Sequence, residues 1–490
     1  QASMNSITIV GGGTAGLITA LILKKRLNVK IQAIVPSNIG IIGIGEGSTE
    51  HFDNFIQHMG LDVEDVLRET RGTLKSGIMF ERWTDKHYWY LHHIHSMWNI
   101  KLGLSARNYE YLMINNKGAR CFAPMTLFNN EVGLEPIDRL IQYHFNTFKL
   151  NEYLTKLCKE NEIKIIDDEI VKVTLDDKGI KELKGKKKTY RSSFYIDCTG
   201  FKKLLISKLG AKWQSYSKYL KTNSAIAFPT ENQEEYNIWT LAKAMKYGWM
   251  WQIPTYGRTG NGYVYSDKYT NKEEAKKEIE KLLGKKIEIA KHIKYDPGAL
   301  DKPWIKNCVA VGLCANFVEP LEATSIGTTI QQAFLLMQYL ENYNQQSINI
   351  YNKQVSTIME NVRDFIQLHY INNKKTTNFW KDVNKVEPSD TLKQYMHVWK
   401  SGRLLKSTDM ESIGHYNLFT LFKEDNFNLI AYFNGLIDTK LLRNSYNIVN
   451  KNLKRYWLEN RIEGDMLWRN TNRTRKMSHK KYIQEIHDKN

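Results

Sequence analysis

The sequence predicts an α/β protein with an added antiparallel sheet and a mainly helical C-terminal module. Three observations lead to this prediction. The N-terminal residues run from an apolar strand pattern through a glycine-rich turn into an apolar helix pattern. Short apolar and aromatic runs alternate with turns from Ser224 to Tyr269 and are typical of strands. Beyond residue 350 the pattern is mostly helical with charged faces.

The clearest local unit is "SITIVGGGTAGLITALILKKRL", near the start of the chain. Ile7–Val10 has the pattern of a buried strand, Gly11, Gly13 and Gly16 have the G-x-G-x-x-G spacing, and Leu17–Leu27 continue as a helix. In this order, the glycines allow a tight turn, close approach of a pyrophosphate and close packing of helix on strand. A helix N-terminus then favours the negative charge. The unit therefore predicts a Rossmann-like module that binds a dinucleotide, with an ordinary tight turn as the alternative.

Two later strands bear on the same ligand. The strand Lys30–Val35 ends in Val35, where an acidic residue that binds the ribose is expected, and valine cannot accept a hydrogen bond. Val35 therefore gives no support for a ribose contact, whereas the glycine turn still predicts that the phosphates bind at the start of the helix. The segment Ser192–Phe201 reads as a buried strand closed by Asp197 and Gly200, which predicts a second contact with the dinucleotide. A plain strand-ending turn is the alternative, because Asp and Gly are common turn residues.

Composition excludes several classes of protein. Hydrophobic residues make up 42% and aromatic residues 12% of the 490 residues, which predicts a folded globular protein. No apolar run approaches the roughly 20 residues that cross a bilayer, and the first residues lack a secretory signal pattern. Five scattered cysteines without a C-x-x-C pair predict a reducing cytoplasm and no metal site. We therefore expect a cytoplasmic protein without a membrane partner.

The net charge of +18 raises the question of nucleic acid. No zinc-finger spacing, RNA-binding signature or basic-zipper heptad is present, so no nucleic-acid partner is expected. Part of the excess lies in the tail, at Arg469, Arg473, Arg475, Lys476, Lys480 and Lys481. We expect a solvated C-terminus there, with a tail that docks nucleic acid or a membrane as the alternative.

An ordered series of motifs resembles the flavin-dependent halogenases of the tryptophan halogenase family. The series covers most of the first 380 or so residues. It consists of "GGGTAG", "GEGST", "TLKSGIMFERW", "YHFNTFKLNEYL", "FYIDCTGFKKLLI", "GWMWQIPTYGRTGNGYVYS", "NCVAVGLCANFVEPLEATSI" and "RDFIQLHY". The W-x-W-x-I-P block together with the N-terminal glycine motif is the distinguishing pair of the family.

The resemblance implies a two-component enzyme. A separate flavin reductase supplies reduced FAD, which reacts with dioxygen and a halide (chloride, bromide or iodide) to give hypohalous acid. This oxidant travels through a tunnel and halogenates an electron-rich aromatic ring of the indole or phenol type. Residues 4–380 form the FAD-binding halogenase module, with the sheet insertion at about 205–300, and residues 381–490 cover the substrate. The alternative is a single-component flavin monooxygenase that hydroxylates an aromatic, and a homo-oligomer is left open.

Two side chains carry the implied chemistry. Lys75, in "GTLKSGIMF", matches the lysine at the far end of the tunnel, which hydrogen-bonds hypohalous acid or carries the halogen as a haloamine. Its apolar flanks predict burial and a lowered pKa. Glu322, the second glutamate of "EPLEATSI", matches the carboxylate that orients the oxidant, stabilises the arenium cation or takes its proton. Glu319 is the neighbour most easily confused with it. A surface lysine and a helix-start carboxylate are the plain alternatives.

Thr324 and Ser325 match the positions whose backbone N–H groups hold the halide. The family usually has glycine at the second position, so the Cβ of Ser325 puts chloride preference in doubt and leaves bromide and iodide, which are easier to oxidise. Trp249 and Trp251 lie on the same side of an extended segment. The resemblance implies that they separate the flavin from the organic substrate, with aromatic core as the alternative.

The remaining assignments concern the cofactor and the aromatic substrate. The resemblance implies cofactor contacts at Gly11, Gly13, Thr14, Ala15, Gly16, Gly45, Glu46, Asp197, Gly200, Gly312 and Ile326. The cluster His92, His93 and His95 is expected either to line the site that binds the aromatic substrate or to consist of hydrogen-bonded or exposed histidines without a role in binding. It lacks the Cys or carboxylate pattern of a metal site. An aromatic box for the substrate is one expectation for Tyr456, Trp457 and Trp468, and packing in the hydrophobic core is the alternative.

Overall fold

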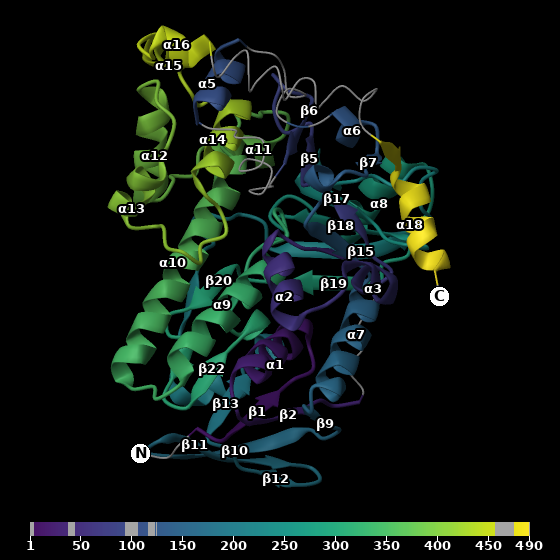
Figure 1. Ribbon diagram of the computed structural model, residues 1–490, viewed down its shortest axis with the longest axis vertical. Helices are drawn as coiled ribbons and strands as arrows, with labels where there is room; N and C mark the ends of the chain where they lie inside the picture. The colour runs from purple at the N-terminus through teal and green to yellow at the C-terminus, as the bar shows by residue number, and fades with distance from the viewer. Residues whose placement is uncertain are drawn as a thin grey trace.

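The computed structural model describes residues 4–37, 45–93, 106–115, 123, 125–455 and 475–489 (Figure 1). Its base is a six-stranded sheet with the order β21-β22-β13-β1-β2-β9, parallel except for the edge strand β21. The strands are β1 (Ser6–Val10), β2 (Lys30–Ile34), β9 (Lys164–Ile166), β13 (Phe194–Asp197), β21 (Trp304–Ile305) and β22 (Cys308–Ala310). Parallel neighbours joined through helices are the Rossmann-like arrangement that the sequence predicts.

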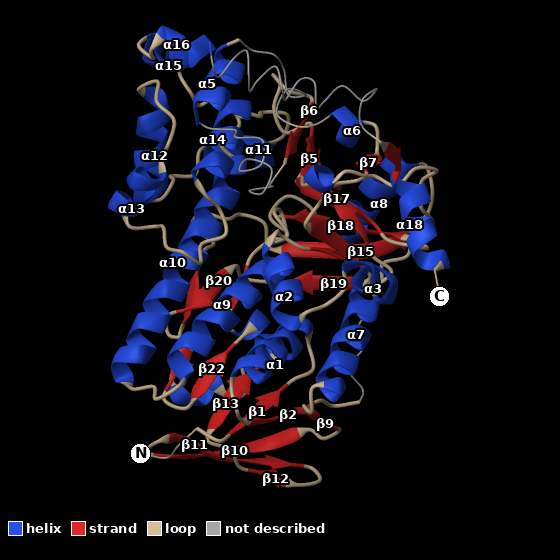
Figure 2. Cartoon of the chain, in the orientation of Figure 1, coloured by secondary structure: helices blue, strands red, loops and turns tan. Residues whose placement is uncertain are grey.

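Helices cover this sheet (Figure 2). The helices α1 (Thr14–Arg26), α7 (Thr147–Glu160) and α10 (Gln345–His369) contact its strands, and α9 (Thr324–Leu340) packs on α1 and α10. The helix α2 (His51–Met59) packs on α1 and α9, and α3 (Val63–Glu69) packs on α7. The helix α1 packs against both α9 and α7, and its residues from Gly16 to Leu23 are all buried. This explains why α1 is apolar on every side.

The second large sheet has the order β19-β15-β18-β17-β16-β5-β6, with antiparallel neighbours except for β16 and β5. Its strands are β5 (Ile78–Glu81), β6 (Trp89–His92), β15 (Ser224–Thr230), β16 (Thr240–Met245), β17 (Gly248–Pro254), β18 (Thr259–Tyr265) and β19 (Lys291–Lys294). The helix α8 (Lys272–Leu283) packs on one face through Ala275 and Ile279. The predicted added sheet is confirmed, and it also takes in two strands that lie before residue 205.

A small sheet connects the two large ones. Its order is β3-β8-β4, formed by β3 (Glu46–Gly47), β8 (Gln142–Phe145) and β4 (Thr73–Lys75), all antiparallel. It brings the "GEGST" segment and Lys75 together across β8. Further short strands are β7 (Glu131–Gly133), β10 (Ile170–Asp176), β11 (Gly179–Gly185), β12 (Thr189–Tyr190), β14 (Trp213–Ser215), β20 (Gly298–Leu300) and β23 (Asn316–Phe317).

The C-terminal part is mainly helical, as predicted. Its helices are α11 (Asn378–Asn384), α12 (Asp390–Lys400), α13 (Ser407–Ile413), α14 (Glu424–Phe433), α15 (Thr439–Asn447) and α16 (Lys451–Arg455). The earlier helices α5 (Ala106–Ile114) and α6 (Met125–Phe128) lie in the same upper part of the molecule (Figure 1). The helix α14 packs against α10 and β6, close to the site described below. The module boundary at residue 380 stays a prediction.

The chain ends in β24 (Lys476–Ser478) and α18 (His479–Asp488), far from α15 and α16 in Figure 1. The strand β24 pairs with β7, and α18 packs on α3 with His479, Ile483 and Ile486 buried. The expectation of a solvated tail is therefore wrong for residues 476–488, because one face of α18 is apolar and is covered by the protein.

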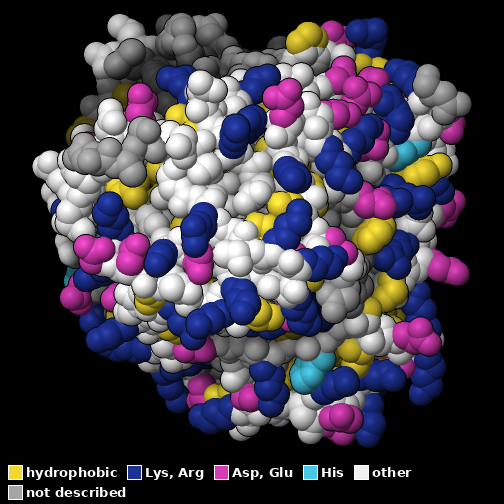
Figure 3. All heavy atoms as spheres, turned by 90° about the horizontal axis from the view of Figure 1, so that it is seen from below, with side chains coloured by type: hydrophobic (Ala, Val, Ile, Leu, Met, Phe, Trp, Pro, Cys, Tyr) yellow, Lys and Arg dark blue, Asp and Glu magenta, His cyan; other side chains and the backbone are white. Residues whose placement is uncertain are grey.

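The charged surface is mixed. Figure 3 shows Lys and Arg side chains spread over the lower face, with Asp and Glu side chains among them. None of the helices in the described ranges is long and apolar enough to cross a bilayer.

Candidate active site

The glycine turn after β1 depends on the absence of side chains. Gly11 has φ +110°, and a Cβ there would lie 2.0 Å from the carbonyl oxygen of Cys198. A Cβ on Gly16 would lie 3.1 Å from Sγ of the same cysteine, so the turn packs directly on the end of β13. Only glycine fits the first position.

The start of α1 is left open for an anion. Gly13 is the N-cap, no side chain caps the helix that begins at Thr14, and its first turn holds no acidic residue. Val35 packs on the turn, because a Cβ on Gly12 would lie 2.3 Å from its Cγ1. The side chain of Asn151 donates to the carbonyl oxygen of Gly12 (2.7 Å). A helix N-terminus without its own cap fits the diphosphate of FAD.

Asp197 orders the loop that follows β13. Its fully buried carboxylate accepts hydrogen bonds from the backbone N–H groups of Thr199, Leu205 and Ile206 at 2.9–3.0 Å. A direct contact between this carboxylate and the dinucleotide therefore stays a prediction. The short helix η5 (Gly312–Cys314) packs against α1.

The predicted cofactor residues of three segments meet there. Gly312 has φ +66°, and a Cβ there would lie 2.7 Å from Cβ of Ala15 and 3.9 Å from Sγ of Cys198. Gly200 has φ +70° and no atom within 4 Å of its would-be Cβ. The turns at Gly11 and Gly312 are thus closely packed, whereas the turn at Gly200 faces open space.

Lys75 is a fully buried lysine at the end of β4. Its Nζ donates to the carbonyl oxygen of Ser48 (2.6 Å). A Cβ on Gly47 would lie 3.4 Å from this Nζ and 3.5 Å from Cβ of Ala323, so the lysine, the "GEGST" segment and the start of α9 meet. Burial lowers the pKa of Lys75 to about 8, although the charge of Glu322 acts in the opposite direction. The predicted burial is confirmed.

Glu322 is a fully buried carboxylate held by two histidines. Nδ1 of His92, from β6, lies 2.9 and 3.0 Å from its two oxygens, and Nε2 of His369, from α10, lies 2.7 Å from Oε1. Burial acts to raise the pKa of Glu322, but His92 and His369 outweigh burial and lower this pKa to about 2. Glu322 is therefore ionised at neutral pH.

The two histidine rings differ in their other hydrogen-bond partners. Nδ1 of His369 lies 2.7 Å from the carbonyl oxygen of Phe365, which can only accept, so both ring nitrogens of His369 donate when Glu322 is ionised. The amide nitrogen of Asn426 donates to Nε2 of His92 (3.3 Å), because the amide oxygen accepts a backbone N–H. His92 thus bonds Glu322 through Nδ1 and Asn426 through Nε2, and His369 bonds Glu322 through Nε2 and the carbonyl oxygen of Phe365 through Nδ1.

Glu319 has different partners from Glu322. It is buried and accepts hydrogen bonds from Nε1 of Trp249 (2.8 Å), the hydroxyl of Tyr370 (2.5 Å) and the hydroxyl of Thr222 (3.0 Å). Burial raises its pKa, while these hydrogen bonds act to lower it. The two glutamates are three residues apart but bind different groups: Glu322 binds two histidines, and Glu319 binds a tryptophan, a tyrosine and a threonine.

The two tryptophans of β17 share one side of the strand, as predicted, with ring centroids 6.2 Å apart. Trp249 is buried and fixed by Glu319. The ring of Trp251 covers Gly262 on β18, where a Cβ would lie 2.0 Å from the ring. Both rings are held in place from outside β17. Their predicted role as a partition between flavin and substrate stays a prediction.

The start of α9 has the form of an anion site. Ala323, the N-cap, has φ +53°, a left-handed conformation that is costly for alanine. No side chain caps the helix, whose first residues are the buried Thr324 and the exposed Ser325. A Cβ on Gly327 would lie 2.6 Å from Oγ1 of Thr49, so the helix packs tightly on the "GEGST" segment.

Other predicted site residues lie around this centre. Gly45 has φ +100° and packs against Ile253 of β17, and Ile326 is buried in α9. Burial raises the pKa of Glu46, on β3, to about 7. Nδ1 of His93 donates to the carbonyl oxygen of Ser76 (2.8 Å). The remaining predicted residues, His95, Tyr456, Trp457 and Trp468, lie outside the described residues.

Sequence reasoning missed the partners of Glu322. His369 lies on an apolar stripe of a helix, and Asn426 lies in α14. A histidine among apolar neighbours was the one available signal, and the pattern did not link it to Glu322, 47 positions away. No cluster of three metal-ligating side chains occurs within the described part of the chain.

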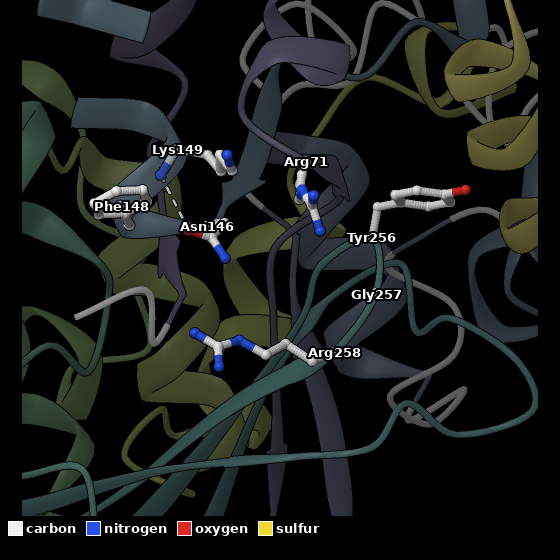
Figure 4. Close-up of a pocket in the computed structure, with 7 residues that line it drawn as sticks. All are labelled: Arg71, Asn146, Phe148, Lys149, Tyr256, Gly257 and Arg258. Carbon is white, nitrogen blue, oxygen red and sulfur yellow. Dashed lines mark hydrogen bonds between the residues drawn. The ribbon is translucent and has the colours of Figure 1, made fainter. Parts of the chain in front are cut away.

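A separate cavity of about 360 Å³ lies at the turn between β17 and β18 (Figure 4). The side chains of Arg71 and Arg258 and the amide of Asn146 point toward a common space, whereas the ring of Tyr256 points away from it. The described residues that line it are Arg71, Asn146, Phe148, Lys149, Tyr256, Gly257 and Arg258. The cavity is cationic, and neither catalytic residue predicted from the sequence lines it.

The chain is similar to known halogenases over most of its length. The family model of tryptophan halogenases matches residues 6–445. Tryptophan 6-halogenase SttH of Streptomyces toxytricini is 29% identical over 442 residues, covering 81% of this chain and 84% of that protein. Tryptophan 7-halogenase RebH of Lentzea aerocolonigenes is 25% identical over 446 residues, covering 82% and 83%.

A solved structure agrees with these relatives. Tar14, a tryptophan C-6 flavin-dependent halogenase (chlorinase) from taromycin biosynthesis, superimposes with a TM-score of 0.84 and 25% identity, covering 98% of this chain and 99% of that one. Because the family match spans nearly the whole chain, this protein belongs to the tryptophan halogenase family of flavin-dependent enzymes.

Proposed function

We propose that this protein is a flavin-dependent aromatic halogenase in which Lys75 and Glu322 direct the halogen from hypohalous acid to an electron-rich ring of the indole or phenol type. The observation that carries the proposal is the buried, partly deprotonated Lys75 beside the ionised Glu322. A hydroxylase that brings its substrate to the flavin has no need of such a lysine.

The N-terminal turn and α1 would hold the diphosphate of FAD, and bound reduced FAD supplies the activation of dioxygen that oxidises the halide. The turn at Gly200, which faces open space, and the turn at Gly312, which packs on Ala15 of α1, would hold the rest of the cofactor. We propose that a separate reductase supplies the reduced form. The cationic cavity next to α7 would draw the anionic cofactor toward this side of the protein.

Lys75 would receive the oxidant. Its amine is half deprotonated near pH 8, because burial disfavours the ammonium form. The neutral amine attacks the halogen of hypohalous acid; the N–halogen bond forms, the O–halogen bond breaks, and the oxygen leaves as water with a proton from the amine. The ammonium form instead donates a hydrogen bond to hypohalous acid.

Glu322 would act as a fixed anion near the reacting ring. Its contacts with His92 and His369 already occupy much of its accepting capacity and hold its orientation. A preorganised charge of this kind stabilises the arenium cation without rearranging during the reaction. Its low pKa makes it a weak base. We therefore propose that it orients the oxidant and stabilises the arenium cation, rather than removing the proton from the ring.

The halide would bind at the start of α9, to the backbone N–H groups of Thr324 and Ser325. The helix has no side-chain cap there, which favours an anion. Ser325 carries a Cβ at the position where the family usually has glycine. We therefore propose that bromide and iodide are used in preference to chloride.

One experiment tests the proposal. The protein is incubated with FAD, a flavin reductase, NADH, oxygen, a halide and a panel of indoles and phenols, and the products are read by mass spectrometry. We expect replacement of hydrogen by halogen, and loss of this product in Lys75→Ala while flavin oxidation continues. A hydroxylated product that forms equally well without halide would establish the monooxygenase alternative instead.

A further inference from the structure

The C-terminal helix reaches the strand that carries Lys75 through one side chain, His479. This residue begins α18 and is fully buried. The backbone N–H of Leu74 donates to its Nε2 (3.0 Å), across 405 positions of sequence. Its Nδ1 donates to the carbonyl oxygen of Tyr236, also at 3.0 Å. The ring thus joins the residue before Lys75 to the segment that leads into β16.

Both bonds require one form of the ring. A carbonyl oxygen can only accept and a backbone N–H can only donate, so Nδ1 carries the proton and Nε2 carries none. Burial lowers the pKa of His479 to about 4. The titratable neighbours of the ring are His144, whose pKa burial also lowers, and Tyr236, whose ring lies edge-on at 6.3 Å; Lys480 lies over the ring of Tyr236. His479 therefore stays neutral in one tautomer.

His479 bonds the edge of β4 with which no strand in the described residues pairs. β4 is the edge strand of the sheet β3-β8-β4, and it pairs with β8 on one side only. Leu74 is buried, so its N–H would lack any partner without His479. A buried backbone donor without a partner is costly and is avoided in folded proteins.

The residue on the other side of Lys75 is held by the same assembly. The N–H of Ser76 donates to the carbonyl oxygen of Ile238 (2.7 Å), and the N–H of Ile238 donates to the side chain of Asn130 (3.1 Å). The carbonyl oxygen of Asn130 in turn accepts the N–H of His479 (2.9 Å). Both neighbours of Lys75 are thus connected to the first residue of α18.

We propose that His479 is a positioning residue for Lys75: α18 closes the free edge of β4 and so fixes the depth and direction of the lysine. The inference rests on the proposed function, since it concerns the same lysine. It gives the last helix of the chain a role in aromatic halogenation that the distance in sequence conceals.

The test compares His479→Ala, His479→Gln and a matched control, Ile483→Ala. Ile483 is fully buried on the same helix, so its truncation weakens the packing of α18 without removing the ring. Each variant is assayed for aryl halogenation across pH and for hypohalous acid released to a small-molecule trap.

We expect His479→Ala to lower kcat for aryl halogenation by about 10- to 100-fold, with hypohalous acid still formed, because a small displacement of a catalytic group has effects of this size. The midpoint of its pH profile moves upward, since a less buried lysine returns toward its ordinary pKa. Added imidazole restores part of the rate. His479→Gln, whose amide both accepts and donates, keeps most of the activity.

Two results would overturn the inference. One is a loss in His479→Ala no larger than in Ile483→Ala, with an unmoved pH midpoint. The other, if His479→Ala does not fold, is a folded His479→Gln that binds FAD but has lost aryl halogenation. A wild-type protein that halogenates nothing would instead refute the proposed function, so the two failures are distinguishable.

Discussion

Nε2 of His369 lies 2.7 Å from Oε1 of Glu322, and both side chains are fully buried. The other nitrogen of the ring lies 2.7 Å from the carbonyl oxygen of Phe365, so this buried pair is also bonded to the backbone of α10. Removal of one partner from such a pair leaves an uncompensated charge, which is strongly destabilising. The pair therefore fixes the charge of Glu322 more firmly than an exposed carboxylate allows.

Replacement of His369 by Gln should raise the pKa of Glu322. The amide still donates a hydrogen bond but carries no charge, so burial is opposed less than in the wild type. We expect the acid limb of the pH–rate profile to move upward, because Glu322 is protonated at a higher pH. His92→Gln is the companion variant. The charge and the hydrogen bond of His92 also lower the pKa of Glu322, so this variant should move the limb in the same direction. A limb that stays in place in both variants would contradict the role of the two histidines.

Lys75 should cost the protein stability at neutral pH. Its pKa is lowered from 10.5 to about 8, so the folded state binds fewer protons than the unfolded state between these values. Stability then rises with pH across this window, and the full penalty applies below pH 8. We expect Lys75→Met to be more stable than the wild type at pH 7, by roughly 1–3 kcal/mol after loss of the bond to Ser48. Denaturant unfolding at pH 7 and pH 10 measures the difference.

The difference between the two proteins should shrink as the pH rises toward 10, where an unfolded lysine also loses its proton. A difference that is constant with pH would mean that Lys75 is not destabilised by burial. The reaction rate of the wild type should rise through pH 8 if the neutral amine receives the halogen.

The sequence predicted the parts of this site that depend on local pattern. The turn at Gly11, the strand Gly248–Pro254 with both tryptophans on one side, and the buried Lys75 all follow from spacing and apolar flanks. The partners of Glu322 did not follow, because they come from β6 and α10 and meet only after the sheets and helices pack.

The C-terminal tail shows the same limit. A count of basic residues predicts a solvated segment, but the face that decides the structure of α18 is the one with His479, Ile483 and Ile486. Charge at exposed positions carries no information about which face of a helix is covered.

Truncation of the tryptophans should change the products. Trp251→Ala removes the ring that covers Gly262, and Trp249→Ala also releases Glu319. If the rings keep the organic substrate away from the flavin, hydroxylated product should appear beside the halogenated one in mass spectra. Trp304→Ala is the control, because Trp304 is a fully buried tryptophan on β21 of the six-stranded sheet and belongs to a different hydrophobic core from Trp249. Lost stability without a new product in all three variants would leave only a packing role.

The residue at the second position of α9 should set the choice of halide. Ser325→Gly removes the Cβ, which allows the backbone N–H groups at the helix start to adjust around a small anion. We expect the ratio of chlorinated to brominated product, in a competition with equal chloride and bromide, to rise several-fold. Ser325→Ala keeps the Cβ and removes only the hydroxyl, so it should behave like the wild type. If alanine and glycine raise the ratio equally, the hydroxyl rather than the backbone controls the halide, and the anion site is not tuned by the Cβ.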